Sequence, residues 1–317
     1  MGRAAGSKAV IVFDEETTYG ADPASVNGRK LFLVKENLRA SRNLIADDTL
    51  RGNRNQVLPE GGNIDVSGGI SVNIAETAHA TLLKHLLGAV TTTGAADPYT
   101  HVLKVGSLPV GLVIEKGFTD LVQYFKYNGC RVAKASFKFP KEGFITADFD
   151  IKGAKETVSG TAYDSTVTEL AYGGFSHAKM SIEEGGSAIA TVVEAEITID
   201  NDLDAEGYVI GGAGQRKDLP EGFAIVSGKL SAFFDSITLY NKAVNLTETS
   251  LKITLDKGVT PARSIEFFIP ELVYERNAPV VEGPKGVMVE LPFKAYYDNG
   301  ADASALKITL KNGLATI

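Results

Sequence analysis

The sequence predicts a mainly β protein that contains two tandem copies of one domain, each with a short helix. A repeated segment is the first evidence, because residues 58–68 read LPEGGNIDVSG and residues 219–228 read LPEGFAIVSG. An identical tetrapeptide and an identical tripeptide at near-equal offsets indicate duplication, and a period of about half the chain is too long for a solenoid. The second observation is that most apolar runs are short and alternate with polar residues, as in half-buried strands.

The first copy has a strand, then a helix, then further strands. GGISVNI (68–74) alternates between apolar and polar residues. ETAHATLLKHLLG (76–88) places four leucines on one helical stripe and ends at Gly88, a residue type common just after a helix. SFKF (136–139) and FITADFDI (144–151) are the next candidate strands.

The second copy repeats this order. GKLSAFF (228–234) is the strand, and DSITLYNKAVN (235–245) is the short helix, with Asp235 as its expected N-cap. Three candidate strands follow: LKITL (251–255), SIEFFI (264–269) and VMVELPFKAYY (287–297).

A long polar loop precedes each repeated strand. These loops span residues 45–63 and 204–222, and we call them the LPEG loops because each contains that tetrapeptide. Each carries acids followed by a basic run that contains glycine. The basic runs are RGNR (51–54) and GGAGQRK (211–217). The second run lacks the Gly-Lys-Ser/Thr sequence of a phosphate-binding loop.

The chain therefore divides into five segments. A lone alternating strand, ALKITLK (305–311), follows the second copy and must pair either with its own sheet or with a neighbour's edge. The segments are an N-terminal arm with one short strand at Ala9–Phe13 (1–29), copy one (30–155), a linker (156–175), copy two (176–297) and a C-terminal strand extension (298–317).

Composition limits the function classes. Hydrophobic residues make up 44% and charged residues 22%, which are globular values. No apolar run approaches 18 residues, so we expect no membrane insertion. The single cysteine, Cys130, excludes an intrachain disulfide and fits synthesis in a reducing compartment. The net charge of −7 argues against a protein that grips nucleic-acid phosphates.

One strand is strongly acidic. The stretch 181–206 contains eight acids and neither lysine nor arginine. Within it, VEAEITID alternates strictly, so Glu194, Glu196 and Asp200 share one face and the apolar residues share the other. This pattern predicts a strand with one buried face and one acidic, solvated face.

The motifs that suggest chemistry do not withstand inspection. DNDLDAEG (200–207) resembles a calcium loop, but Ala205 replaces the required glycine and Gly211 replaces the bidentate glutamate. The four histidines lack metal-binding spacing. We therefore expect no catalytic residues, no cofactor and no metal.

Several segments resemble those of one known protein family. In the first copy they are ENLRASRNLIADDTLRGNRNQ, DVSGGISV and LLKHLLGAV. In the second copy they are EAEITIDNDLDAEGYVIGGAGQRKDLPEG and VSGKLSAFF. IEKGFTDL (114–121) and the closing VMVELPFKAYY also resemble strands of that family, and together these segments cover most of residues 30–297. The chain thus resembles the major tail tube proteins of long-tailed bacteriophages.

The resemblance implies a β-sandwich or barrel-like domain with a flanking helix. Six such domains form a ring whose inner strands merge into one barrel, and stacked rings form the tube that houses the tape-measure protein and conducts DNA. The implied partners are further copies, the tape-measure protein, passing DNA, the tail terminator, and distal tail or baseplate proteins. Two domains per chain favour three chains per ring with pseudo-sixfold symmetry; six chains would place one copy outside the barrel. The implied location is the virion tail, after synthesis in the host bacterial cytoplasm.

Two sets of residues follow as hypotheses about the tube. Glu194, Glu196 and Asp200 either face the lumen, where acids repel DNA, or lie on the outer surface. The two LPEG loops either contact the next ring or are plain surface loops. Their candidate contact residues are Arg51, Arg54, Glu60, Arg216, Lys217 and Glu221.

Two other function classes compete with the tube. One is a different β-rich virion protein, such as a capsid decoration or a baseplate component, which would form isolated trimers or monomers instead of tubes. The other is a carbohydrate-binding or hydrolytic β protein. The absence of tryptophan and of a paired-carboxylate motif weighs against that class.

Overall fold

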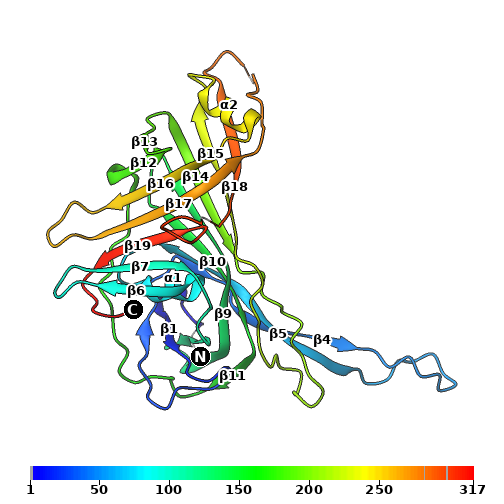
Figure 1. Ribbon diagram of the computed structural model, residues 1–317. Helices are drawn as coiled ribbons and strands as arrows, with labels where there is room; N and C mark the ends of the chain where they lie inside the picture. Colours follow the sequence, from blue (N-terminus) through cyan, green and yellow to red (C-terminus); the bar gives the residue numbers. More distant parts are fainter. Residues whose placement is uncertain (1–2, 282, 298) are drawn as a thin grey trace.

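The structure is a computed structural model that describes residues 3–281, 283–297 and 299–317. Residues 1, 2, 282 and 298 lie outside the described parts; they include the start of the predicted arm and the first residue of the predicted C-terminal segment. Nineteen strands and two α-helices occur in the described parts, which confirms a mainly β fold (Figure 1). Two short 3₁₀ turns are also present: η1 (Gly6–Lys8) and η2 (His177–Lys179).

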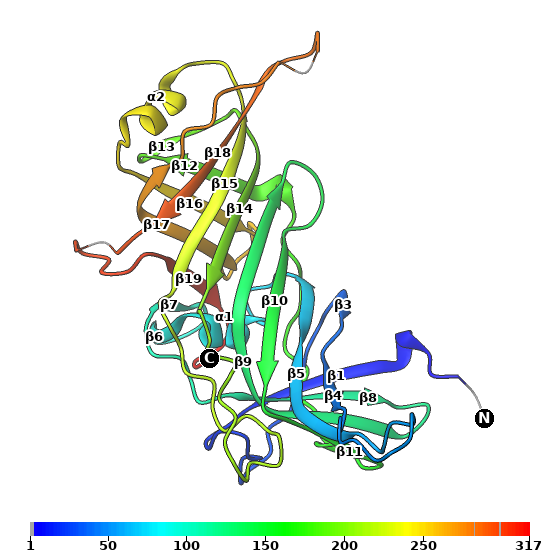
Figure 2. The same cartoon turned by 90° about the vertical axis from the view of Figure 1, so that its right-hand side faces the viewer.

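Seven long strands pair antiparallel in one sheet, which we call the central sheet (Figure 2). In spatial order they are β4 (Arg39–Ile45), β5 (Glu60–Asn73), β10 (Thr146–Gly153), the second half of β9 (Gln123–Pro140), β14 (Val192–Asp200), β15 (Ile225–Phe233) and β18 (Met288–Ala295). The two-residue strand β3 (Lys35–Glu36) precedes β4 in the sequence and pairs with the same edge of β5, at Ile70 and Ser71.

Two outer sheets cover one face of the central sheet. The first contains β2 (Arg29–Lys30), β1 (Ala9–Glu15), β8 (Leu112–Phe118), the first half of β9, and β11 (Lys155–Ser159). The second contains β13 (Ser187–Ala188), β12 (Met180–Glu184), β16 (Thr249–Asp256), β17 (Ser264–Tyr274), β19 (Lys307–Asn312), β7 (Tyr99–Val105) and β6 (Gly88–Thr93).

The ends of the chain take part in these outer sheets. The strand predicted at Ala9–Phe13 is β1, which pairs with β8 along seven residues. The predicted lone strand at the C-terminus is β19, which pairs with both β17 and β7. Each candidate strand named from the sequence overlaps an observed strand.

The same strand pairing occurs twice along the chain. β4 and β10 flank β5, and β14 and β18 flank β15. The repeated tripeptide Val-Ser-Gly occupies the same place in both sets, because Ser67 opposes Lys152 and Ser227 opposes Lys294. The duplication seen in the sequence therefore corresponds to a duplication of strand order and register.

The two sets join through one antiparallel pairing, which we call the seam. It runs between β9 and β14 over seven residue pairs, from Glu194 opposite Pro140 to Asp200 opposite Lys134. Because each strand of the seam also pairs on its other side, the backbone hydrogen bonds continue from one set into the next.

The hydrophobic core lies between the central sheet and the outer sheets. Phe137 and Phe139 of β9 both contact Phe267 of β17, with ring centroids 4.9 and 5.3 Å apart. All three side chains are fully buried. Since β9 lies in the first half of the chain and β17 in the second, this aromatic cluster packs the two halves together.

The two helices differ in burial. In α1 (Ala80–Leu87) all residues except Lys84 are buried, and Gly88 follows with φ of 90°, which confirms the predicted helix and its glycine end. In α2 (Thr238–Asn245) only Ala243 is buried. The predicted N-cap at Asp235 is wrong, because the backbone N–H of Asp235 still bonds to Phe233 in a turn and the helix begins three residues later.

Candidate functional site

The surfaces available to a partner are the candidate site of this molecule. Among the described residues, no three His, Cys, Asp or Glu side chains form a group that could hold a metal ion. Neither described helix is long and apolar enough to cross a membrane. The surfaces that carry the predicted residues are the exposed face of the central sheet and the two LPEG loops.

The three acids of β14 lie on the exposed face of the central sheet. Glu194, Glu196 and Asp200 alternate with apolar residues that point to the core. These apolar residues are 0% exposed: Ala195, Ile197 and Ile199. The face that carries the acids is the one that the outer sheets leave uncovered.

Neighbouring strands place lysines next to these acids. Lys138 and Lys229 oppose Glu196 from β9 and β15, and Lys134 opposes Asp200. The Lys134 Nζ lies 3.7 Å from a carboxylate oxygen of Asp200. The exposed face therefore carries both positive and negative side chains, although all the charged residues of β14 itself are acidic.

Hydroxyl groups fill the positions between the charges. Ser136 and Thr198, which oppose each other across the seam, form a hydrogen bond of 2.9 Å. Ser71 donates a hydrogen bond of 2.5 Å to Asp148. This face is thus polar, and many of its side chains are already engaged with one another.

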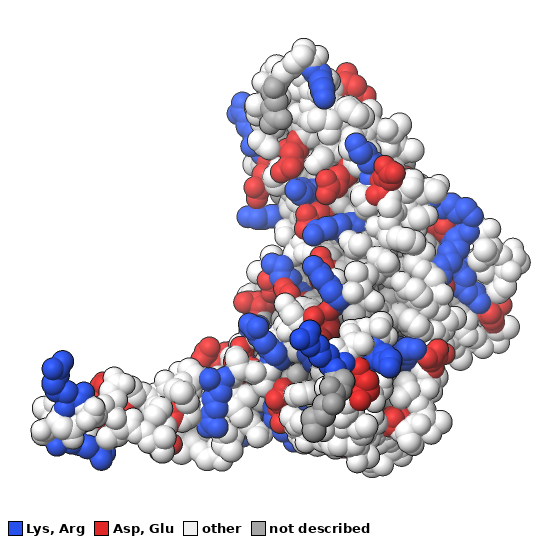
Figure 3. All heavy atoms as spheres, turned by 180° about the vertical axis from the view of Figure 1, so that it is seen from behind, with Lys and Arg blue, Asp and Glu red and all other residues white. Residues whose placement is uncertain are grey.

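The first LPEG loop is the end of an arm that protrudes from the molecule (Figure 1). The arm consists of β4, the start of β5 and the residues between them. Arg51, Arg54 and Glu60 are all exposed on it, and Arg51 forms an ion pair of 3.1 Å with Asp47. Figure 3 shows basic side chains at the tip of the arm, and the basic residues between β4 and β5 are Arg51 and Arg54.

The arm also exposes large apolar side chains. Leu44, Leu50 and Leu58 are 71%, 98% and 85% exposed. Exposed leucines gathered on one protruding element are typical of a surface that another protein covers.

The second LPEG loop folds back onto its own chain. Arg216 is buried, and its guanidinium donates hydrogen bonds to the backbone oxygens of Ala205, Val66 and Gly153 at 2.7, 3.3 and 3.0 Å. It also forms an ion pair with Asp65 of β5. Burial alone would raise the pKa of Asp65, but the hydrogen bonds from Arg216 and Ser67 outweigh it and hold the pKa below its ordinary value.

The other two candidates in this loop differ in their exposure. Glu221 pairs with Arg131 at 3.2 Å and accepts a hydrogen bond of 3.2 Å from the backbone of Leu108. Lys217 is exposed. Arg216 and Glu221 are thus engaged with their own chain. Of the three candidates in this loop, Lys217 is the one whose side chain is left available to a partner.

The match to a known family comes from nearly the whole chain. A family model described as "Phage tail tube protein" matches residues 6–295. The chain belongs to the phage tail tube protein family. It is therefore a structural component of the virion tail, in a family that is not one of enzymes. A search of curated proteins finds no match.

The structure brings the predicted residues of this tail tube protein into three separate places. The β14 acids lie on the central sheet, Arg51, Arg54 and Glu60 lie on the arm, and the second loop packs beside β5. Sequence reasoning missed Asn201, which is buried at the end of β14 and donates to the backbone oxygens of Leu86 and Val132 at 3.0 Å each. Nothing in the sequence distinguishes this asparagine from an ordinary turn residue.

Proposed function

We propose that this protein self-assembles into stacked rings that form the hollow tail tube, the conduit through which phage DNA leaves. The observation that carries the proposal is the seam, which joins two repeated sets of strands edge to edge in one sheet. A pairing that joins two copies within a chain can also join copies on different chains. Repetition around a ring would leave no strand edge exposed.

We propose three chains per ring, with pseudo-sixfold symmetry. In a ring of six chains, one copy of each chain would lie outside the barrel. The seam argues against that arrangement, because removing one copy from the barrel would break seven residue pairs between β9 and β14. The division into an N-terminal segment (1–29), two tube domains (30–155 and 176–297), a linker (156–175) and a C-terminal strand extension (298–317) is part of the same proposal.

The exposed face of the central sheet is the proposed lumen surface. It carries Glu194, Glu196 and Asp200, and the outer sheets cover the opposite face. Lysines beside the acids keep this surface from being strongly acidic or strongly basic. Such a surface would neither bind phosphates tightly nor exclude DNA, and it would also contact the tape-measure protein before DNA passes.

The arm is the proposed contact with the next ring. Arg51, Arg54 and Glu60 would pair with charges there, and the exposed leucines would be covered. In the second loop Lys217 is the candidate for a similar contact, while Arg216 and Glu221 would hold the loop in shape. At the ends of the tube the same surfaces would meet the tail terminator and the distal tail or baseplate proteins.

We propose synthesis in the host bacterial cytoplasm, which the free and buried thiol of Cys130 supports. Burial raises the pKa of this thiol, so the reactive thiolate is disfavoured.

Electron microscopy of the purified, concentrated protein tests the proposal. We expect hollow stacked rings whose end-on class averages have threefold or pseudo-sixfold symmetry. True sixfold rings with outward lobes would retain the tube function and overturn the three-chain ring. Monomers at every concentration, even with a tail initiator complex added, would contradict self-assembly and favour a decoration or baseplate role.

A further inference from the structure

One strand of the repeated pattern is missing from the second copy. In the first copy, the second half of β9 lies between β10 and β14. Its counterpart in the second copy is β17, but only Leu272–Tyr274 pair with β18. The residues that follow, 275–281, belong to no strand; Val280 makes one isolated bridge to Met288.

The register of the sheet shows where these residues belong. Lys134 opposes Asp150 in the first copy. The equivalent of Asp150 is Pro292, whose carbonyl oxygen accepts a hydrogen bond of 2.7 Å from the backbone N–H of Glu275. Glu275 thus occupies the position of Lys134, and in sequence residues 275–281 take the place of 134–140, the part of β9 that forms the seam. In the free chain Val280 bridges Met288 one residue out of this register, in which Met288 would oppose Pro279.

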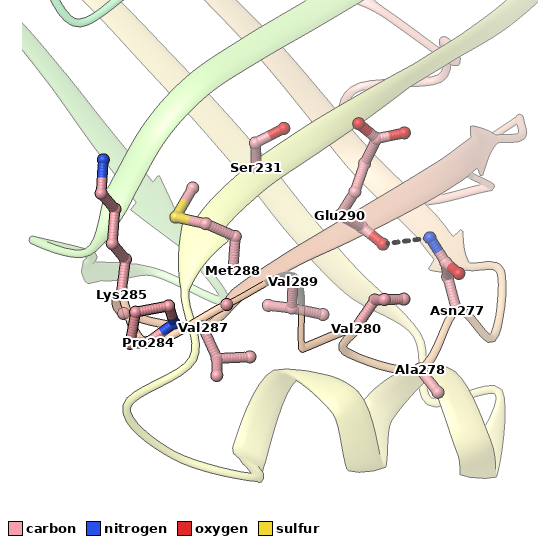
Figure 4. Close-up of a pocket in the computed structure, with 12 residues that line it drawn as sticks. Ser231, Asn277, Ala278, Val280, Pro284, Lys285, Val287, Met288, Val289 and Glu290 are labelled. Carbon is pink, nitrogen blue, oxygen red and sulfur yellow. Dashed lines mark hydrogen bonds between the residues drawn. The ribbon is translucent and has the colours of Figure 1, made fainter.

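This segment is loosely held in the single chain. The Asn277 side chain donates a hydrogen bond of 2.9 Å to the Glu290 carbonyl. Beside it, Asn277, Ala278 and Val280 line a cavity of ≈ 630 Å³ together with residues 283–290 (Figure 4). Val280 and Val281 are 66% and 75% exposed. The end of the segment therefore leaves two valines exposed, which a partner could cover.

The other end of the central sheet offers the complementary edge. β4 pairs with β5 on one side, and no strand in the described parts of the chain pairs with its other side. Residues 35–41 are equivalent to 194–200 of β14, because Arg39 opposes Ser67 as Thr198 opposes Ser227.

We propose that residues 275–281 become a strand when a second copy docks, lying between β18 of their own chain and β3–β4 of that copy. The register repeats that of the seam, so Ser41 of one chain opposes Glu275 of the next, as Asp200 opposes Lys134 within a chain. Arg39 lies two residues before Ser41 on the same face of the strand, and supplies a cation for Glu275. This inference rests on the proposed function and specifies which strands form the joint between chains.

The exposed helix α2 fits the same docking. Its counterpart α1 contacts Asn201, which follows β14 and bonds to Leu86, and the C-terminal segment, because the Lys84 Nζ donates to the backbone oxygen of Ile317 at 3.0 Å. α2 lies at the equivalent place beside the incomplete joint, and the arriving copy covers it in the same way.

Side chains cap the β3–β4 edge in the free chain. The Lys116 Nζ donates to the backbone oxygen of Leu38 at 2.7 Å, and the Glu36 carboxylate accepts from the Leu38 N–H at 2.9 Å. These bonds use the backbone N–H and carbonyl oxygen of Leu38, which would otherwise pair with an added strand, so docking must displace them. Such a cap hinders random edge-to-edge pairing of free subunits.

Disulfide trapping in assembled tubes tests the register. The Ser41→Cys/Glu275→Cys variant is expected to give chain-to-chain disulfides on a non-reducing gel, with a ladder that ends at three chains. In the matched variant Ser41→Cys/Asn277→Cys the second cysteine lies two residues further along the strand, on the same face. Its Cα would lie about 7 Å or more from that of residue 41, so at least tenfold less disulfide-linked product should form. Lys134→Cys/Asp200→Cys is the positive control, which should cross-link within one chain; native Cys130 is fully buried.

Hydrogen exchange of the unmodified protein provides a second test that needs no variant. We expect the amides of 275–278, 280 and 281 to exchange roughly 100-fold more slowly in tubes than in free subunits; residue 279 is proline and has no amide hydrogen. Tubes that form without this protection, or that cross-link equally in both registers, would overturn the inference while leaving the tube function intact. Failure of the unmodified protein to form tubes with an initiator would instead contradict the proposed function.

Discussion

Burial decides which charged side chains of this protein can meet a partner. Arg216 and Lys217 are neighbours in a basic run, and the sequence treats them alike. The structure buries Arg216 among three backbone oxygens and leaves Lys217 in solvent. The difference arises because the loop folds against β5, which is a tertiary contact that local sequence does not encode.

Buried histidine makes the stability of the fold dependent on pH. The His79 Nδ1 accepts from the Ala75 N–H at 3.0 Å, and its Nε2 lies 2.7 Å from the carbonyl oxygen of Phe32. Burial lowers the pKa of His79 from 6.5 to about 4, although the hydrogen bond to Phe32 opposes this shift. The folded state therefore keeps this imidazole neutral under conditions in which the unfolded chain protonates it.

We predict that the free energy of unfolding falls as pH drops from 6.5 to about 4. The sign follows because the unfolded chain binds the proton first, and the pKa difference corresponds to about 3 kcal/mol from this group. Urea titrations followed by circular dichroism at pH 7 and pH 4.5 would measure the loss. His79→Gln should reduce the difference between the two pH values, whereas His177→Gln, at an exposed position, should leave it unchanged.

At the scale of elements, the arm is separate from the core and is available for assembly. We predict that Leu50→Ser/Leu58→Ser leaves the melting temperature of the free subunit within about 2 °C, because both side chains are exposed. The yield of tubes in sedimentation assays should fall at least tenfold, since covering two leucines is worth about 3 kcal/mol. Val259→Ser, at another exposed apolar position, is the control. Normal tube yield from the double variant would remove the arm from the contact between rings.

Strands and the first helix could be predicted from the sequence because their signals are local. Alternation in LKITL and the leucine stripe before Gly88 both depend on nearby residues, and both are confirmed. The predicted start of α2 is wrong, because the N-cap is Ile237, whose side chain makes no capping hydrogen bond, and not Asp235. Local patterns also could not show that β7 pairs with β19, which lies about two hundred residues away.

The candidate site was predictable only in part, for the same reason. Which residues of β14 share a face follows from alternation, and the structure agrees. The net charge of that face does not follow from alternation. Lys134, Lys138 and Lys229 lie on neighbouring strands, and which acids they oppose depends on the register of the whole sheet.

At the scale of the whole molecule, the exposed face of the central sheet should govern the passage of DNA. We predict that Glu194→Lys/Glu196→Lys/Asp200→Lys slows DNA release from virions at low salt, because reversed charges leave the lysines of this face unopposed and attract phosphates. Raising the salt from 50 to 200 mM should restore much of the rate. Fluorescent-dye measurements of ejected DNA would follow the release.

The control for this prediction reverses two acids on the outer face of the second outer sheet, Glu183 and Glu266. That variant should release DNA at the normal rate. Equal release from the triple variant and the unmodified virion at 50 mM salt would show that the β14 acids do not face the lumen.

In the three-chain ring that we propose, carrying both repeated sets of strands on one chain would also change how ring closure depends on protein concentration. Every second joint of that ring would be the seam, which forms during folding and needs no encounter between molecules. Closure would then depend on roughly the third power of subunit concentration instead of the sixth. Dilute subunits would thus spend less time as partly built rings, whose open strand edges are the species most prone to aggregate.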